Sequence, residues 1–371
     1  MAAIGINAHL LSGRPGYRRA GIHNYISGVL AHLPAREHLH YTVFTRQRAE
    51  QAPPQAQRVS TMWPTEKRWL RIAWEQLVWP LSAWRAHLDL LHSMAFVTPA
   101  LSPCPTVVTI YDLSFIHHPD RFPLLQRLYL TSQTRRSCHQ ARRVVTISDA
   151  GRNDVQRVFG VSRDRIDVVQ PGVGAAFRPR PQAEVDAFRQ RHGLPPRFVL
   201  HVGTLQPRKN IPLLIEAMAH PEMPQIPLLL VGGKGWFYDN IFARVEALGL
   251  QDRVHFPGYV PDAELPLWYN AAALFVFPSL HEGFGLPVIE AMACGTPVVA
   301  ADTATIAEAA GDAALRFPPH DGQALLNQML AVLDNEEQAA TMRERGIAHA
   351  RTFSWVRSGR KMADVYERAL L

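Results

Sequence analysis

Two glutamates on either side of a glycine-bearing loop are the residues of this chain best suited to do chemistry. Glu282 precedes the loop and Glu290 follows it eight residues later, within the stretch ALFVFPSLHEGFGLPVIEAMACGTPVVAA at 273–301. Carboxylates repel phosphate, but they accept hydrogen bonds well from the hydroxyl groups of a sugar. Taken alone, the same residues also fit a capped helix whose Glu290 complements the helix dipole.

The residues around this loop predict the elements that position it. Residues 273–277 form an apolar run with the length of a buried strand, and Pro287 stands where a first helical residue is expected. The helix is expected to stop at Gly295, before a second buried strand at 297–300. A helix N-terminus with free N–H groups attracts an anion such as a diphosphate. The residues expected to meet the ligand through this loop are Gly283, Phe284, Gly285 and Leu286.

Two adjacent cations follow another predicted strand, at 197–202. Arg208 and Lys209 lie between the end of that strand and a helix expected from about residue 211, after a loop that begins with Gly203. Parallel α/β sheets place their sites at the carboxyl ends of strands, and two cations there can hold a diphosphate. The same residues also fit an ordinary surface turn that carries two charges.

Asp112 follows a further predicted strand, at 106–110, in the segment Tyr-Asp-Leu-Ser-Phe. We expect its carboxylate to position an acceptor or to transfer a proton, because it too stands at the carboxyl end of a strand. His117, five residues later, is the second candidate, although a histidine after a strand is more often structural.

The spelling HEGFGLPVIEAMACGTPVV resembles the donor-site motif of the retaining glycosyltransferases of family 4, which have the GT-B fold. The resemblance implies that Glu290 binds the nucleotide ribose and that Glu282, with the backbone after it, contacts the donor sugar. Residues 203–210 resemble the family segment Gly-x-x-x-x-x-Arg-Lys-Asn, in which the arginine and the lysine neutralise the donor phosphates.

The same resemblance implies three further positions. The base is expected to lie against the turn at Tyr259 and Val260, and the backbone of Gly21 is expected to face the donor from the opposite domain. The segment around Asp112 resembles the acceptor side of the family, where Tyr111 stands in place of a frequent histidine.

The implied fold class is α/β, with two Rossmann-like domains that face each other across a cleft. A chain of 371 residues is long enough for two cores. We expect an N-terminal acceptor-side domain at 1–171, a C-terminal nucleotide-sugar-binding domain at 172–352, and a last helix at 353–371 that crosses back to the first domain.

One segment, EKRWLRIAWEQLVWPLSAWRAH at 66–87, carries tryptophans every five residues, at 69, 74, 79 and 84. Pro80 is expected to kink or end the first helix. Tryptophan and basic residues favour lipid headgroups, so the segment could contact a membrane. Two short helices that pack their tryptophans inward are the interpretation we favour.

The composition of the chain indicates which classes of partner it can bind and in which cellular compartment it is expected. Residues 1–180 carry 23 Lys and Arg against 11 Asp and Glu, a charge of +12 in a chain of net +7. This half could meet anionic lipid or a phosphorylated acceptor, or it could be a solvated surface; interleaved RNA-binding motifs are missing, so nucleic acid is not expected. Without a signal peptide, a long apolar run or a metal motif, we expect a cytoplasmic protein. Peripheral contact with the inner face of the membrane through the basic domain is left open.

The expected activity is therefore metal-independent, retaining transfer of a sugar to a hydroxyl of a glycan or lipid-linked acceptor. The donor is expected to be a GDP-sugar or a UDP-sugar, with mannose as the first choice, and no cofactor is expected. The alternatives are a nucleotide-sugar epimerase on the same fold and a non-catalytic GT-B partner subunit.

Overall fold

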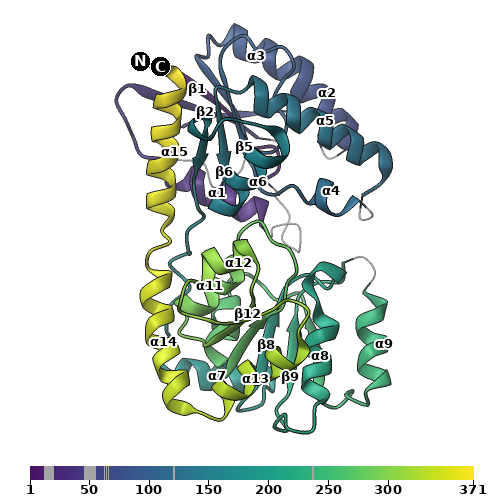
Figure 1. The fold of residues 1–371 in the computed structure, drawn as a ribbon. Coiled ribbons are helices and arrows are strands. Elements are labelled where there is room, and N and C mark those ends of the chain that lie inside the picture. Colours follow the sequence, from purple (N-terminus) through teal and green to yellow (C-terminus); the bar gives the residue numbers. More distant parts are fainter. Residues whose placement is uncertain are drawn as a thin grey trace. The chain divides into compact units, whose positions relative to one another are not determined.

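The structure, a computed structural model, describes residues 1–11, 21–45, 56–61, 63, 65, 67–119, 122–235 and 238–371. Most of the glycine-rich loop before Gly21 lies outside the described residues. The chain forms two compact units (Figure 1). Unit 1 comprises Met1–Gly172 and Trp355–Leu371, and unit 2 comprises Val173–Ser354.

Unit 1 is built on a sheet of seven parallel strands in the order β3-β2-β1-β4-β5-β6-β7. The first strand lies inside the sheet and the order reverses between β1 and β4, which is the Rossmann pattern. Its strands are β1 (Ala2–Asn7), β2 (Leu39–Thr45), β3 (Gln57–Ser60), β4 (Leu90–Ser93), β5 (Thr106–Ile110), β6 (Arg143–Thr146) and β7 (Ile166–Val168). Its helices are α1 (Ile22–Ala31), α2 (Arg68–Ala73), the π-helix η2 (Trp74–Val78), α3 (Trp79–Arg85), α4 (Ser114–His117), α5 (Leu124–Gln140), α6 (Asp149–Phe159), the 3₁₀ turn Arg163–Arg165 and α15 (Trp355–Leu370).

Unit 2 repeats this plan with six parallel strands in the order β10-β9-β8-β11-β12-β13. Its strands are β8 (Val199–Val202), β9 (Leu228–Val231), β10 (Val254–Gly258), β11 (Leu274–Phe277), β12 (Val298–Ala301) and β13 (Leu315–Phe317). Its helices are α7 (Gln182–His192), the 3₁₀ turn η5 (Pro207–Lys209), α8 (Ile211–Ala219), α9 (Asp239–Ala247), α10 (Leu265–Ala271), α11 (Leu286–Ala293), α12 (Ala304–Ala310), α13 (Gly322–Leu333) and α14 (Glu336–Ala350). Both sheets match the expected Rossmann-like domains.

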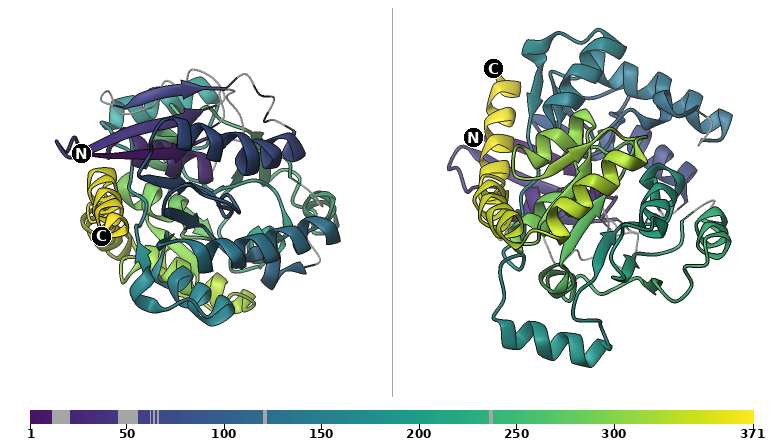
Figure 2. Two further views of the ribbon diagram at one scale, coloured as in Figure 1. Left: turned by 90° about the horizontal axis from the view of Figure 1, so that it is seen from above. Right: turned by 60° about the horizontal axis from the view of Figure 1, so that its bottom comes forward.

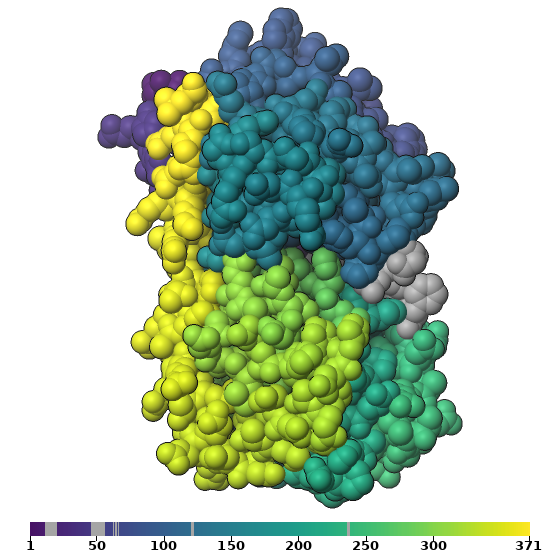
Figure 3. All heavy atoms as spheres, viewed as in Figure 1, coloured from purple at the N-terminus to yellow at the C-terminus, as the bar shows by residue number. Residues whose placement is uncertain are grey.

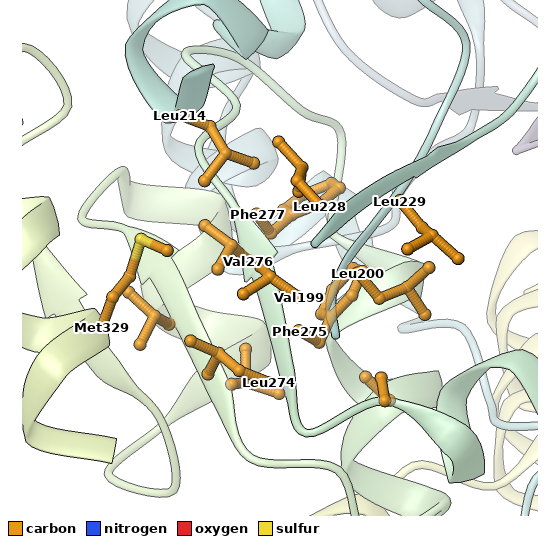
Figure 4. Close-up of a cluster of buried hydrophobic side chains, with 14 of the residues drawn as sticks. Val199, Leu200, Leu214, Leu228, Leu229, Leu274, Phe275, Val276, Phe277 and Met329 are labelled. Carbon is orange, nitrogen blue, oxygen red and sulfur yellow. The ribbon is translucent and has the colours of Figure 1, made fainter. Parts of the chain in front are cut away.

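The core of unit 2 forms because its central strands are apolar on both faces, as parallel strands covered by helices must be. β8, β9 and β11 contribute fully buried leucine, valine and phenylalanine side chains, and Leu214 of α8 and Met329 of α13 pack in the same cluster (Figure 4). This core fixes the carboxyl ends of β8 and β11, from which the charged residues described below project.

The last helix, α15, belongs to unit 1 and packs closely against α1. A Cβ atom added at Gly28 would lie 2.4 Å from the Trp355 ring, and one added at Gly359 would lie 2.0 Å from the carbonyl oxygen of His32. Arg36 also pairs with Glu367 of this helix at 2.6 Å. Both chain ends therefore lie on unit 1, where Figure 2 shows them near each other.

The expectation that the tryptophans of 66–87 all pack inward is wrong for two of the four. Trp74 and Trp79 are buried, whereas Trp69 and Trp84 are about two-thirds exposed, at 65% and 64%. Pro80 lies in the first turn of α3, and the backbone stays helical from α2 through η2 into α3, so the expectation that Pro80 could end the helix is wrong. None of the helices that the structure describes is long and apolar enough to cross a bilayer.

Candidate functional site

A cluster of three charged side chains lies at the carboxyl edge of the unit 2 sheet, where the strand order reverses between β8 and β11. Arg208 and Lys209 lie in η5, after β8, and Glu282 lies in the loop after β11. In open α/β sheets this reversal point is where ligands bind. The structure therefore brings together the three side chains that the sequence selected from segments 73 residues apart.

Glu282 accepts from both cations through one oxygen. Its Oε1 lies 2.7 Å from Arg208 Nη1 and 2.6 Å from Lys209 Nζ. Lys209 is only 5% exposed, and its ammonium group also lies 4.6 Å from the centre of the Phe277 ring. The cluster carries a net charge of one positive unit when all three groups are ionised, so it favours an anion at this edge.

Neighbouring groups hold the Arg208 guanidinium in place. Arg208 Nη1 donates to the carbonyl oxygen of His281 at 3.0 Å, and Leu280 N donates to the Arg208 carbonyl oxygen at 2.9 Å. With its amide turned to satisfy both partners, buried Gln206 accepts from Arg208 Nε at 2.8 Å and from Nη2 at 2.9 Å. These contacts tie the η5 turn to the loop that carries Glu282.

The cluster shifts the pKa values of its own members. Burial acts to raise the pKa of Glu282, but Arg208 and Lys209 outweigh it and bring that pKa down to about 2. Burial lowers the pKa of Lys209 to about 8, against the attraction of Glu282. Glu282 is therefore ionised at neutral pH, while Lys209 loses its proton only slightly above it.

Gly203 lies beside this cluster and leaves room for the lysine. A Cβ atom at Gly203 would come within 3.1 Å of Lys209 Cε, and one at Gly232 would lie 2.0 Å from the Gly203 carbonyl oxygen. The turns after β8 and β9 therefore touch through their backbones, which only glycine permits at Gly232.

The helix expected after the loop is α11, which begins at Leu286. Gly285 precedes it with a φ of 111°, a left-handed conformation that favours glycine, and Pro287 is the second helical residue, not the first as expected. Phe284 is buried and its ring packs edge-on against Phe353. The first turn of α11 thus starts from a fixed loop, with the positive end of the helix at the carboxyl edge of β11.

Glu290, in α11, is buried at 9% exposure and is bonded to a residue that the sequence analysis missed. Its Oε2 accepts from Tyr269 Oη at 3.3 Å, and Tyr269 itself is fully buried in α10. Burial raises the pKa of Glu290 to about 7, although the Tyr269 hydrogen bond acts to lower it. Glu290 can therefore change its charge near neutral pH. Tyr269 has no local sequence signal, because the contact is purely tertiary.

The predicted base-binding turn follows β10, next to the turns just described. Tyr259 is 42% exposed and its Oη donates to Asp262 at 3.2 Å, whereas Val260 is buried. Gly258, with a φ of 81°, accepts from Gly232 N at 2.8 Å. The turns after β8, β9 and β10 therefore form a continuous backbone surface on one side of the charged cluster.

Asp112 and Gly21 belong to unit 1. Asp112 Oδ1 accepts from Ser114 N at 2.8 Å, which begins α4, and Gly21 begins α1 with a φ of 54°. His117 Nε2 lies 2.7 Å from Asp154 Oδ2, so it is held in an ion pair when it is protonated. Tyr111 is buried and donates to the Met94 carbonyl oxygen at 2.7 Å, which is a structural role.

Gln206 and His201 are the other neighbours that the sequence analysis missed. Burial, and then the nearby Lys209, lower the pKa of His201 to about 4, and its Nδ1 lies 3.0 Å from the Val276 carbonyl oxygen. A polar residue inside an apolar strand was the one signal that could have indicated His201. Among the described residues, no group of three His, Cys, Asp or Glu side chains is arranged to hold a metal ion.

Comparison with known sequences identifies two family models along the chain. Residues 184–349 match the family described as glycosyl transferases group 1, and residues 19–177 match glycosyltransferase family 4. Together the two matches extend over both units.

Curated relatives include two mannosyltransferases of Escherichia coli. The O-antigen chain mannosyltransferase B is 34% identical over 265 residues, which are 70% of this chain and 70% of that protein. The serotype-specific mannosyltransferase WbdA is 28% identical over 305 residues, or 79% of this chain but only 37% of the longer relative.

Solved structures share the fold over the full chain. The sucrose-phosphate synthase of Thermosynechococcus elongatus has a TM-score of 0.78 at 24% identity, covering 99% of this chain and 98% of that one. Anabaena HepE, solved in complex with UDP and glucose, has a TM-score of 0.76 at 21% identity, covering 99% and 100%.

Proposed function

We propose that this chain, which belongs to the group 1 glycosyltransferases with the GT-B fold, transfers mannose from GDP-mannose to a hydroxyl group of a growing glycan or lipid-linked acceptor. The observation that carries the proposal is the convergence of Arg208 and Lys209 on Glu282 at the strand-reversal edge of unit 2. The choice of mannose rests on the similarity to the E. coli O-antigen mannosyltransferase.

Breaking the bond between the sugar and the diphosphate leaves negative charge on the leaving group and positive charge on the anomeric carbon. Arg208 and Lys209, with the N-terminus of α11, stabilise the first charge without a metal ion. Glu282 contacts both cations and orients them. Its carboxylate also accepts hydrogen bonds from hydroxyl groups of the donor sugar. The transfer retains anomeric configuration by attack on the same face that the diphosphate leaves.

Glu290 accepts hydrogen bonds from the ribose hydroxyls, and the backbone at Tyr259 and Val260 meets the base. The loop from Gly283 to Leu286 contacts the donor sugar and phosphates, as does the backbone of Gly203. Asp112 positions the acceptor hydroxyl or takes its proton, and Gly21 supplies a backbone contact from unit 1. An epimerase or a non-catalytic subunit is not favoured, because the charged cluster is intact and the curated relatives named above are transferases.

The first experiment is thermal unfolding with GDP, UDP and ADP at equal concentration in the presence of EDTA. A ligand that binds only the folded chain stabilises it by about 2.7 kcal/mol at a hundredfold excess over its Kd. We expect GDP to raise Tm most, and Glu290→Ala to abolish that shift.

Transfer is then measured from GDP-mannose and UDP-glucose, and the anomeric configuration of the product is read by NMR. A Tm shift with UDP alone would replace mannose by another donor. No shift with any nucleotide would contradict the donor site itself.

A further inference from the structure

The π-helix η2 brings two of the four tryptophans of 66–87 together, Trp74 and Trp79. Trp79 N donates to the Trp74 carbonyl oxygen, a bond between residues five apart that an α-helix does not make. Trp74 and Trp79 therefore stack with their ring centres 6.1 Å apart and pack in one cluster with Phe44 and Leu91. The other two tryptophans, Trp69 and Trp84, are left facing solvent.

Exposed leucines accompany these two tryptophans. Leu77, Leu81 and Trp84 recur at intervals of four and three residues, which is the spacing of one helical face. Of thirteen exposed large hydrophobic residues in the described part of the chain, nine lie between residues 63 and 128. They are Trp63, Trp69, Leu77, Leu81, Trp84, Leu101, Leu124, Leu125 and Leu128.

Hydrogen bonds join the elements that carry these residues. Arg68 Nη1 in α2 donates to Gln126 Oε1 in α5 at 2.6 Å. Gln76 in η2 accepts from Ala100 N at 2.8 Å, next to Leu101, and Arg136 of α5 donates to the Thr98 carbonyl oxygen at 2.7 Å. We call the exposed apolar residues on α2, η2, α3, the loop at 98–101 and the start of α5 the α2–α5 surface. Figures 1 and 3 show α3 and α5 at the outside of unit 1.

The charges within these elements are almost all positive. Lys67, Arg68, Arg71 and Arg85 accompany α2, η2 and α3, and the one acidic residue described there, Glu75, lies 3.7 Å from Arg71. α5 contains no aspartate or glutamate, and its arginines are Arg127, Arg135 and Arg136. Tryptophans, leucines and basic residues are thus interspersed on one set of joined helices.

We propose that the α2–α5 surface seats unit 1 in the headgroup region of an anionic phospholipid bilayer. Tryptophan rings prefer that region, and burial of leucine side chains at the boundary of the acyl chains lowers the free energy. The charged ends of lysine and arginine bind the lipid phosphates while their aliphatic stems lie against the apolar layer. The positive charge and the exposure of the leucines match such a surface, and no contact with unit 2 is needed. The proposal does not rest on the donor or on its sugar.

The test is flotation of the full chain with vesicles of phosphatidylcholine alone or mixed equally with phosphatidylglycerol. We expect binding to the mixed vesicles at low salt, loss of binding at high salt, and weak binding to phosphatidylcholine. The double variant Trp69→Ser/Trp84→Ser should lose at least about tenfold in partition, because two interfacial rings are removed. Lys67→Gln/Arg85→Gln should lose about 25-fold, at about fivefold for each charge.

Two controls match these changes outside the α2–α5 surface. Val356→Ser removes an exposed apolar side chain from α15, and Arg343→Gln/Arg345→Gln removes two exposed charges from α14 in unit 2. Both should float like the wild type. Binding of GDP should be equal in all variants, which separates this test from that of the donor site.

Wild-type protein that stays unbound to the mixed vesicles, or tryptophan variants that float equally well, would overturn the proposal. So would a concentration-dependent dimer, measured by analytical ultracentrifugation, that the Trp69→Ser/Trp84→Ser change dissociates. That result would assign the surface to a second copy of the chain.

Discussion

Lys209 Nζ lies 2.6 Å from Glu282 Oε1, and the carboxylate that neutralises this lysine also binds Arg208. Glu282 therefore pairs with the two cations that the proposed function assigns to the donor diphosphate. A bound diphosphate would take over part of the role of Glu282 and leave that carboxylate available to a sugar hydroxyl. In the proposed function, Glu282 thus links phosphate binding to sugar binding.

Replacing Glu282 by glutamine should separate affinity from turnover. Glu282→Gln removes the carboxylate that acts to raise the pKa of Lys209, so Lys209 of the variant loses its proton at a lower pH than in the wild type. At acidic pH, where Lys209 of both proteins stays protonated, the variant should bind GDP about threefold tighter, because a negative charge beside the phosphates is gone. Its kcat should fall about 100-fold, since the oriented carboxylate is lost from the site. Unfolding free energy should fall by about 2–3 kcal/mol, because Lys209 is left buried beside Arg208 alone.

Calorimetric titration with GDP, urea unfolding and a transfer assay measure these three effects. Glu337→Gln, on the exposed side of α14, is the control for the loss of one carboxylate. A GDP affinity that falls together with kcat would show instead that Glu282 supports the phosphate site.

The affinity for GDP should depend on pH with two limbs. The proposed donor site needs Glu290 ionised, to accept from the ribose hydroxyls, and Lys209 protonated, to attract the phosphates. The raised pKa of Glu290, about 7, weakens binding as pH falls, and the lowered pKa of Lys209, about 8, weakens it as pH rises. Each limb should approach about tenfold per pH unit. A Kd that stays constant from pH 6 to pH 9 would contradict both assignments.

Glu290→Gln tests the acidic limb on its own. The amide still accepts from Tyr269, but it does not titrate, so the acidic limb should vanish while the basic limb remains. Because burial disfavours the ionised carboxylate, the folded chain binds more protons than the unfolded chain between about pH 4.5 and 7, and stability falls across that window. At pH 8 the variant should be more stable than wild type by up to about 3 kcal/mol.

The sequence predicted this site better than it predicted the contacts within it. Runs such as Val298–Ala301 and Leu274–Phe277 are apolar throughout, so the strands and the residues at their carboxyl ends followed directly. The ion pair between Lys209 and Glu282 and the bond between Tyr269 and Glu290 were not predicted, because they depend on the packing of separate segments.

Two helical regions of unit 1 show the same limit. α5 was not predicted because its polar and basic residues form no apolar stripe. The two interpretations of 66–87 treated its four tryptophans alike, and the pairing of Trp74 with Trp79 was not predicted because α-helical spacing does not represent the π-helix between them.

Tyr269→Phe should move the acidic limb without removing it. The Tyr269 hydrogen bond favours the ionised form of Glu290, so its loss should raise the pKa of Glu290 and shift the acidic limb to higher pH. Stability should fall by about 1 kcal/mol for one buried hydrogen bond. The pH dependence of GDP binding, compared with wild type, measures the shift. An unchanged limb would mean that another group titrates there.

Asp112→Asn should stop turnover while GDP binding is kept. The asparagine can still accept from Ser114 N, as Asp112 does at 2.8 Å, so the start of α4 should be preserved. We expect kcat to fall at least about 100-fold if the carboxylate positions the acceptor or takes its proton. His117→Gln should cost much less. Equal losses in both variants would move the acceptor role to His117.

Gly359→Ala should destabilise unit 1, because the added Cβ atom would lie 2.0 Å from the His32 carbonyl oxygen. The backbones of α1 and α15 would have to separate, which we expect to cost about 2–3 kcal/mol of unfolding free energy. Gly174→Ala is the control, since its added Cβ atom would meet Phe177 at an ordinary 3.5 Å. Urea unfolding and hydrogen exchange of α15 measure the effect. If α15 exchanges faster while the GDP Kd is unchanged, then the close contact with α1 holds α15 on unit 1 and is not needed for donor binding. Equal stability of the two variants would show that the helices move apart at little cost.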